Sequence, residues 1–276
     1  MEVKHILVPM DFSPCAINAL KAAAQMAYHW EGKLFIAHAL QIPEAYMTIA
    51  GTYTPVDYKS IQEEVGHSFQ SLTDKVPELN LVKYETHEMT IDLLDGLFSL
   101  VQSKQIDLIV MGTKSQHDKL ERLIGTHAAE VIESTHTPVL MIPETEVATS
   151  IKKIGFATDG KSIVNTSRLN YIVALAEYLE AEVEVFFVGK SGENIDFETS
   201  ANKKVIERYL QSIKHSYVNV TSEKILQGIL HHVEKEEIQL LTMIPRHHDL
   251  FYKWIHGSTT KYMAQHLKIP LLALPE

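Results

Sequence analysis

Two glycine-containing segments in the first half of this chain have the residue types that bind an anion. Gly112 follows an apolar run that ends at Met111, and Gly125-Thr126 opens a stretch of helix-forming residues. A glycine lets the backbone approach a phosphate oxygen closely, and the unpaired N–H groups at a helix start favour an anion. The pattern therefore indicates an anion site, although a glycine after a strand is often only a turn residue.

These segments must be held by strands and helices that the sequence also predicts. The run Ile6-Leu7-Val8 is short, unbroken and apolar, which is typical of a parallel strand covered on both faces. Ser13 and Pro14 then provide an N-cap and a first helical residue before an alanine-rich stretch. Within residues 1–144, the pattern predicts strands at 6–8, 34–40, 82–87, 107–111 and 139–142, helices at 16–30, 59–75, 91–104 and 125–135, and a loop or lid at 42–57.

The second half of the chain repeats the first. An apolar run that ends at Asp11 recurs with its end at Asp159, and Gly125-Thr126 recurs as Gly257-Ser258. The second copy predicts strands at 153–158, 182–188, 217–221, 239–243 and 271–274, and helices at 164–180, 196–215, 225–236 and 258–267. So long a repeat indicates a duplicated domain. We therefore expect an α/β protein with two tandem, doubly wound, five-stranded parallel-sheet domains, at 1–144 and 151–276.

The predicted site lies beyond the carboxyl ends of the strands, where ligands bind to open parallel sheets at a reversal of strand order. Three segments of the first half are expected to meet there, namely Pro9-Met10-Asp11, Ala39 and Met111-Gly112-Thr113-Lys114-Ser115. The helix start at Gly125-Thr126-His127 is expected beside them. An Asp after a strand is often only a turn or helix-capping residue, so these residues alone do not identify the ligand.

Composition excludes several classes of function. A net charge of −10 argues against general nucleic-acid binding, which needs a basic face. We expect no membrane partner, because no apolar run approaches the roughly 20 residues of a spanning helix, and a cytoplasmic location, because no signal-peptide pattern is present. The single cysteine, Cys15, rules out an internal disulfide. The common catalytic motifs are missing from the sequence, so an enzyme is the weaker hypothesis.

Three weaker signals remain. His231-His232, His247-His248 and His256 could suggest a metal site, but adjacent histidines on a helix point in different directions, so no metal is predicted. Cys15 lies just inside a predicted helix, where its thiolate is somewhat stabilised, but there is no second cysteine to resolve an oxidised form. The aromatic run at 251–255 indicates either loop packing or a patch that binds a partner.

The spacing in the first half resembles that of the universal stress protein family, in the tandem form with two such domains in one chain. The adenine-nucleotide signature of that family is a glycine, two residues, a second glycine, nine residues, and a third glycine followed by serine or threonine. This chain has Gly112, two residues, Ser115 at the second glycine position, nine residues, and then Gly125-Thr126. The strand that ends at Asp11 and the strand after Pro138 also match.

The resemblance implies an adenine nucleotide, ATP or AMP, with Mg²⁺ accompanying ATP. By position, Asp11 would accept a hydrogen bond from the adenine amino group. The base pocket would be formed by Pro9, Ala39 and Met111, and the ribose and phosphates would be held by Gly112, Thr113, Ser115, Gly125, Thr126 and His127. In the second half, Ile244 and His247 occupy the first two glycine positions, with Pro245 between them. We therefore expect residues 151–276 to bind no nucleotide.

The leading hypothesis is a stress-response protein that acts as a non-catalytic adenine-nucleotide sensor. Nucleotide binding to the first half would alter the domain interface or the 42–57 segment, and so a contact with an unidentified protein partner. The alternatives are a ligand-independent interaction scaffold and a very slow ATPase. Universal stress domains commonly pair through their last strands, which implies an intramolecular pseudo-dimer with 139–142 antiparallel to 271–274. Further association into a homodimer stays open.

Overall fold

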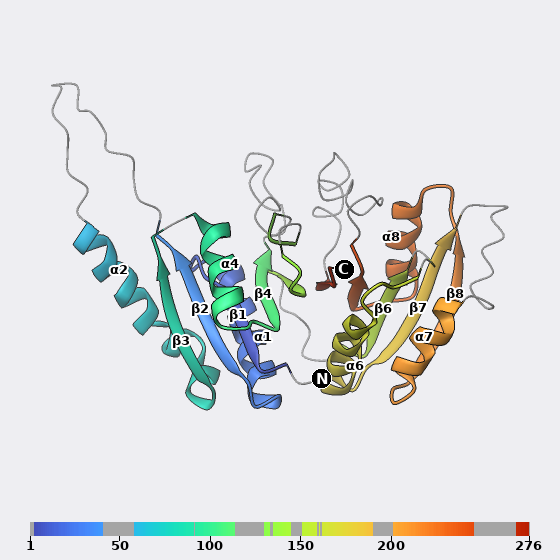
Figure 1. The fold of residues 1–276 in the computed structure, drawn as a ribbon, viewed down its shortest axis with the longest axis horizontal. Coiled ribbons are helices and arrows are strands. Elements are labelled where there is room, and N and C mark those ends of the chain that lie inside the picture. The colour runs from blue at the N-terminus through green and yellow to red at the C-terminus, as the bar shows by residue number, and fades with distance from the viewer. Residues whose placement is uncertain are drawn as a thin grey trace, which may run out of the picture.

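The two halves of the chain contain the same succession of strands and helices, coloured blue to green and then yellow to red in Figure 1. The computed structural model describes residues 3–40, 58–90, 92–113, 130–132, 135–144, 151–158, 160, 162–189, 201–245 and 269–275. The first half contains β1 (His5–Pro9), α1 (Pro14–His29), β2 (Lys33–Ala39), α2 (Tyr58–Gln70), α3 (Leu72–Lys75), the 3₁₀ helix η1 (Pro77–Leu81), β3 (Lys83–Met89), α4 (Leu93–Ser103), β4 (Leu108–Thr113) and β5 (Val139–Pro143). The second half contains β6 (Lys153–Thr158), the 3₁₀ helix η2 (Thr166–Arg168), α6 (Leu169–Leu179), β7 (Glu182–Gly189), α7 (Ala201–Leu210), β8 (His215–Thr221), α8 (Ile225–Lys235), β9 (Leu240–Met243) and β10 (Leu271–Ala273).

All of these strands belong to one sheet, in the order β3-β2-β1-β4-β5-β10-β9-β6-β7-β8. The two central strands, β5 and β10, are antiparallel, with Leu272 opposite Leu140. On either side of this pair, neighbouring strands run parallel. The predicted fold of two doubly wound parallel-sheet domains is confirmed, and so is their pairing through the last strands.

Helices cover both faces of the sheet. Successive residues of a strand point to opposite faces, and in β1 the side chains of Ile6 and Val8 join one buried cluster while Leu7 joins another. Helices α1, α2, α6 and α7 pack on the first of these faces, and α4 and α8 pack on the second. Strands buried on both faces account for the short, unbroken apolar runs of the sequence.

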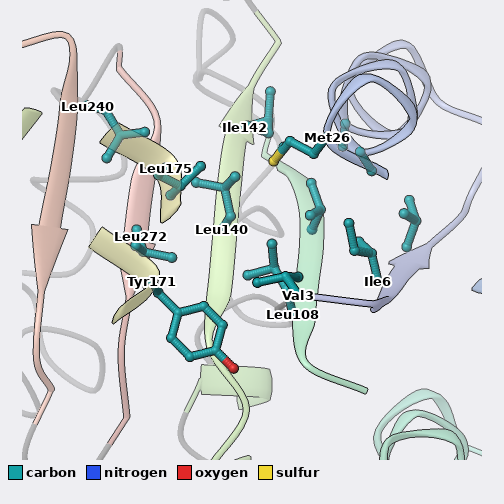
Figure 2. Close-up of a cluster of buried hydrophobic side chains, with 14 of the residues drawn as sticks. Val3, Ile6, Met26, Leu108, Leu140, Ile142, Tyr171, Leu175, Leu240 and Leu272 are labelled. Carbon is teal, nitrogen blue, oxygen red and sulfur yellow. The ribbon is translucent and has the colours of Figure 1, made fainter. Parts of the chain in front are cut away.

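The hydrophobic core on the first face continues from one half of the molecule into the other (Figure 2). Leu140 of β5 and Leu272 of β10 lie in the same cluster as Leu175 of α6, and all three are buried. Tyr171, also in α6, reaches across to the first half and donates a 2.9 Å hydrogen bond to the backbone carbonyl of Asp107. The two halves therefore share one core.

Helix α1 begins as its sequence predicts. The hydroxyl of Ser13 accepts a hydrogen bond from the backbone nitrogen of Ala16 at 3.3 Å, and Pro14 is the first helical residue. The buried face of the helix carries several small side chains, which are Ala16, Ala19, Ala23, Ala24 and Ala27. Because these side chains occupy little volume, the backbone of α1 can lie close to the strands of the sheet.

The helix predicted at 59–75 is interrupted at one residue. In the structure α2 ends before Ser71 and α3 follows it. The Ser71 hydroxyl donates to the backbone carbonyl of Ser68 at 2.8 Å. Such local bonding to the backbone competes with the regular helical pattern, which explains the break.

The helix predicted at 196–215 extends beyond the end of the helix in the structure. Helix α7 ends at Leu210, and His215 already pairs with Val183 as the first residue of β8. Apolar residues at helical spacing, such as Ile213 after Leu210, continue the helical pattern in the sequence, but the pairing with β7 determines the structure. Tertiary contacts often override such local patterns.

Some predicted elements fall on residues that are not described. Of the helix predicted at 125–135, residues 130–132 and 135 are described; 130–132 are helical and Thr135 is not. The helix predicted at 258–267 and the loop predicted at 42–57 lie outside the described residues. Among the helices that the structure does describe, none is both long and apolar enough to cross a membrane.

Candidate ligand-binding site

The carboxyl ends of β1, β2 and β4 meet where the strand order reverses. Strand β1 lies between the other two, with Pro9 opposite Ala37 of β2 and Leu7 opposite Ile109 of β4. The chain leaves β1 toward β2 on one side and later returns to β4 on the other, which makes this edge the switch point of the first half. The predicted site residues at this edge are Pro9, Asp11, Ala39, Met111, Gly112 and Thr113.

The carboxylate of Asp11 closes a turn just beyond β1. Its Oδ1 accepts hydrogen bonds from the backbone nitrogen of Ser13, at 3.0 Å, and from the Ser13 hydroxyl. The same hydroxyl lies 3.0 Å from the Cys15 thiol. Asp11 is exposed, and among the residues described no donor contacts its Oδ2.

The middle residue of this turn has an uncommon backbone conformation. Phe12 has a φ of 60°, in the left-handed region. A residue with a β-carbon pays about 1–2 kcal/mol there. The Phe12 ring lies 5.0 Å from the ring of His38 in β2 and 5.3 Å from that of Phe69 in α2, between centroids. These contacts offset part of the backbone cost.

The three aromatic residues Phe12, His38 and Phe69 are not singled out by the sequence pattern. The repeat does carry a signal for one of them, because Gly160 follows Asp159 where Phe12 follows Asp11. Gly160 has a φ of 74°, so the residue after the aspartate has a left-handed backbone in both halves. A glycine in one copy is the residue expected at such a position.

Gly112 lies where β4 meets the start of α1. A β-carbon at this position would overlap the backbone carbonyl of Cys15 and would lie 2.7 Å from the backbone nitrogen of Ala16. The absence of a side chain therefore lets α1 begin directly against the end of β4, and this packing brings Gly112 close to the turn at Asp11. A glycine is required here by the fold, whether or not a phosphate binds.

The neighbouring Thr113 is held against β5. Its hydroxyl donates to the backbone carbonyl of Ile142 at 3.4 Å. Asn18 of α1 donates to the next carbonyl, that of Pro143, at 3.0 Å. The ends of β4 and β5 are thus tied to each other and to the helix that follows the Asp11 turn.

The remaining predicted binding residues lie outside the described part of the chain; they are Ser115, Gly125, Thr126 and His127. The same holds for the second-half residues Asp159, His247, His248, His256, Gly257 and Ser258, and for the aromatic run at 251–255.

The corresponding edge of the second half is built differently. By strand register, Ile244 stands where the first half has Gly112. Ile244 carries a side chain where Gly112 has none, and this side chain packs against the core of the first face. Helix α1 begins at Pro14, two residues after Phe12, whereas α6 begins only at Leu169, after η2. The helix predicted at 164–180 is therefore wrong at its start.

His231 and His232 point in different directions, as expected. His231 is exposed, whereas His232 is buried with its Nε2 2.6 Å from Oε1 of Glu184. The other oxygen of Glu184 lies 2.9 Å from the Lys153 ammonium. His232 is thus the partner of a buried carboxylate. Within the described ranges, no group of three or more His, Cys, Asp or Glu side chains is arranged to hold a metal ion.

Comparison with known proteins gives consistent matches. A model of the Universal stress protein family matches residues 2–143. A universal stress protein of Methanocaldococcus jannaschii is 25% identical over 140 residues, which cover 50% of this chain and 81% of that protein. The crystal structure of a universal stress protein from Archaeoglobus fulgidus covers 100% of this chain and 97% of its own, with 14% identity and a TM-score of 0.68, so both halves share its fold. A universal stress protein solved in complex with cAMP covers 52% of this chain, with 20% identity and a TM-score of 0.38.

Proposed function

The chain belongs to the universal stress protein family, and we propose on this premise that residues 1–144 form a domain that binds an adenine nucleotide, ATP or AMP. Residues 151–276 would form a partner domain without a nucleotide site. The nucleotide would lie beyond the ends of β1, β2 and β4, where ligands bind to sheets of this kind.

The observation that carries the proposal is Oδ2 of Asp11, which no donor contacts among the residues that the structure describes. One carboxylate oxygen is engaged by Ser13, which fixes the direction of the other. Such an oxygen can only accept hydrogen bonds when the carboxylate is ionised. The six-position amino group of adenine is a donor, whereas guanine carries a carbonyl acceptor there. Asp11 would therefore select adenine.

The other residues at this edge suit the remaining parts of a nucleotide. Pro9 and Met111 are buried and Ala39 is half-buried and small, so they would line the base. The ribose and phosphates would lie toward Gly112, Thr113, Ser115, Gly125, Thr126 and His127. The backbone N–H groups at the start of the helix after Gly125 would be donors to phosphate oxygens, and Mg²⁺ would enter with the phosphates of ATP.

We propose that the protein works as a sensor and not primarily as an enzyme. Bound nucleotide would change the surface offered to a protein partner, through the 42–57 segment or through the contact between the halves. The second half would support the first, because Ile244 replaces the glycine that lets the helix start lie against the sheet. A ligand-independent scaffold is the second candidate, and it is favoured by the structural need for Gly112, which exists without any ligand.

Calorimetric titration of the full chain with ATP, AMP and GTP would separate the two candidates. A sensor would bind ATP or AMP with a stoichiometry of one and would bind GTP at least about tenfold more weakly, which corresponds to about 1.4 kcal/mol. If no adenine nucleotide binds at millimolar concentration, the sensor is wrong and the scaffold is the better description.

A further inference from the structure

The backbone of Phe12 decides where the Asp11 carboxylate points, because Phe12 is the middle residue of the turn that Asp11 and Ser13 close. In the second half, the residue after the aspartate is Gly160, which has a left-handed backbone as well, at a φ of 74°. The first half makes it with a residue that disfavours this region, at a φ of 60°. Contacts of the Phe12 side chain must therefore hold the backbone in place.

His38 of β2 holds the turn from one side. Its Nδ1 lies 2.6 Å from the backbone carbonyl of Met10, and since a carbonyl only accepts, Nδ1 carries the proton. The backbone nitrogen of Met10 donates to the backbone carbonyl of Ala37, which is also in β2, at 2.8 Å. The residue before Asp11 is thus bound to β2 through its backbone, while the residue after it packs on the His38 ring at 5.0 Å.

Phe69 of α2 holds the turn from the other side. Its ring meets the Phe12 ring edge to face at a centroid distance of 5.3 Å and an interplanar angle of 74°. It also lies 6.5 Å from the His38 ring. Phe69 is buried although α2 is largely exposed. Helix α2 therefore contacts the Asp11 turn through Phe69, and Phe12, His38 and Phe69 form a ring cluster.

We propose that Phe12 is a positioning residue for base selection, held by the ring cluster so that Oδ2 of Asp11 points at the six-position of the bound base. This inference rests on the proposed function. Base specificity would then depend on Phe12, which does not touch the nucleotide. A movement of α2 would change the direction of the Asp11 carboxylate through Phe69. A residue that only stabilised the fold would affect all nucleotides alike.

The test compares the affinities of ATP and ITP, because ITP has a carbonyl where ATP has the amino group. We expect the full-length protein to prefer ATP by about tenfold or more, the size of one hydrogen bond to a charged group. Phe12→Gly adopts the left-handed turn freely, as Gly160 does, so the protein should still fold. Without the ring the turn is no longer held, and the preference should fall to about twofold or less. Phe69→Leu should reduce it in the same direction, and Tyr28→Ala, at an exposed position of α1, should leave it unchanged.

A double variant identifies the route of the effect. In an Asp11→Ala background, Phe12→Gly should change ATP affinity no further, because the group that it positions is gone. Additive losses, or an equal loss of ATP and ITP in Phe12→Gly, would overturn the inference while leaving nucleotide binding intact. If the unmodified protein binds neither ATP nor ITP, the proposed function is wrong and this inference is wrong with it. Circular dichroism melting of each variant confirms that it is folded.

Discussion

The hydroxyl of Tyr171 and the backbone carbonyl of Asp107 join the two halves of the molecule through a 2.9 Å hydrogen bond. Asp107 lies just before β4, and its side chain accepts from the backbone nitrogens of Lys4 and His5, both at 2.8 Å. Asp107 thus joins the starts of β1 and β4 in the first half through its side chain, and it binds α6 of the second half through its backbone carbonyl. Burial, with the nearby Asp107 charge, raises the pKa of Tyr171 to about 12.

Removal of this hydroxyl should weaken the whole molecule. Tyr171→Phe keeps the ring in the core but leaves the Asp107 carbonyl without its partner, so we expect the free energy of unfolding in urea to fall by about 1–2 kcal/mol. Tyr178→Phe is the matched control, because that side chain packs on His29 and Trp30 with its ring. An equal loss in both variants would contradict the assigned role of the hydrogen bond.

The same tyrosine predicts a loss of stability in alkali. Its pKa rises from 10.0 to about 12 on folding, so the folded state holds the proton more tightly than the unfolded state. The stability this provides is complete below pH 10 and is lost as the pH rises toward 12. Urea unfolding across this range should bring the stability of the unmodified protein closer to that of Tyr171→Phe. Parallel pH profiles for the two proteins would show that Tyr171 does not titrate as described.

Two glycine substitutions should have opposite effects on stability. In Gly112→Ala the new methyl group meets the backbone of Cys15 and Ala16, and we expect a loss of about 1–3 kcal/mol. In Gly66→Ala, within α2, nothing lies within 4 Å of the new methyl group. Alanine favours a helix, so this variant should gain about 0.5–1 kcal/mol. Unfolding in urea measures both, and a neutral Gly112→Ala would mean that α1 can move away from β4 at little cost.

Two glutamates of β7 should differ sharply in their contribution to stability. Glu184 is buried between His232 and Lys153, so Glu184→Ala leaves the buried His232 ring without its hydrogen-bond partner and leaves Lys153 with the more distant carboxylate of Glu236, at 3.6 Å, and should cost about 1–3 kcal/mol. Glu182, two residues earlier, pairs with Lys214 in a more exposed position, and Glu182→Ala should cost no more than about 1 kcal/mol. Similar melting temperatures for the two variants would contradict this difference.

The two aspartates of the repeat should differ in nucleotide binding. Asp11→Ala should weaken ATP binding by about tenfold or more, since it removes the charged acceptor of a hydrogen bond that the adenine amino group would donate. Asp159→Ala should leave both the affinity and the stoichiometry of one unchanged. Calorimetric titration of the full chain measures both quantities. A stoichiometry of two that falls to one in Asp159→Ala would place a second site in residues 151–276.

Most strands could be predicted from the sequence, because a strand that is buried on both faces needs apolar residues at consecutive positions. Runs such as Ile6-Leu7-Val8 are apolar over consecutive residues, and a strand covered on both faces needs that pattern. The start of α6 could not be predicted in this way. Residues 164–165 are not helical and Thr166–Arg168 form the 3₁₀ helix η2, although no glycine or proline interrupts the sequence from 164 to 180, so the sequence pattern carries no signal for the later start.

The candidate site could be predicted in part, for a similar reason. Asp11 comes just after β1 and Gly112 lies near the end of β4, so parallel topology alone brings them to one edge. The ring cluster depends on the left-handed backbone of Phe12 and on the packing of Phe69 from α2. Neither follows from residue preferences within a short window, and only the comparison of Phe12 with Gly160 in the repeat points to the turn.

The antiparallel contact between β5 and β10 determines which two halves pair with each other. Because both strands belong to one chain, each half meets its partner at an effective concentration in the roughly millimolar range, and dilution does not separate them. Two separately synthesised subunits would form like pairs as well as mixed pairs. Here every molecule contains one half with Gly112 and one half with Ile244. Fusion thus guarantees a mixed pair at any level of expression.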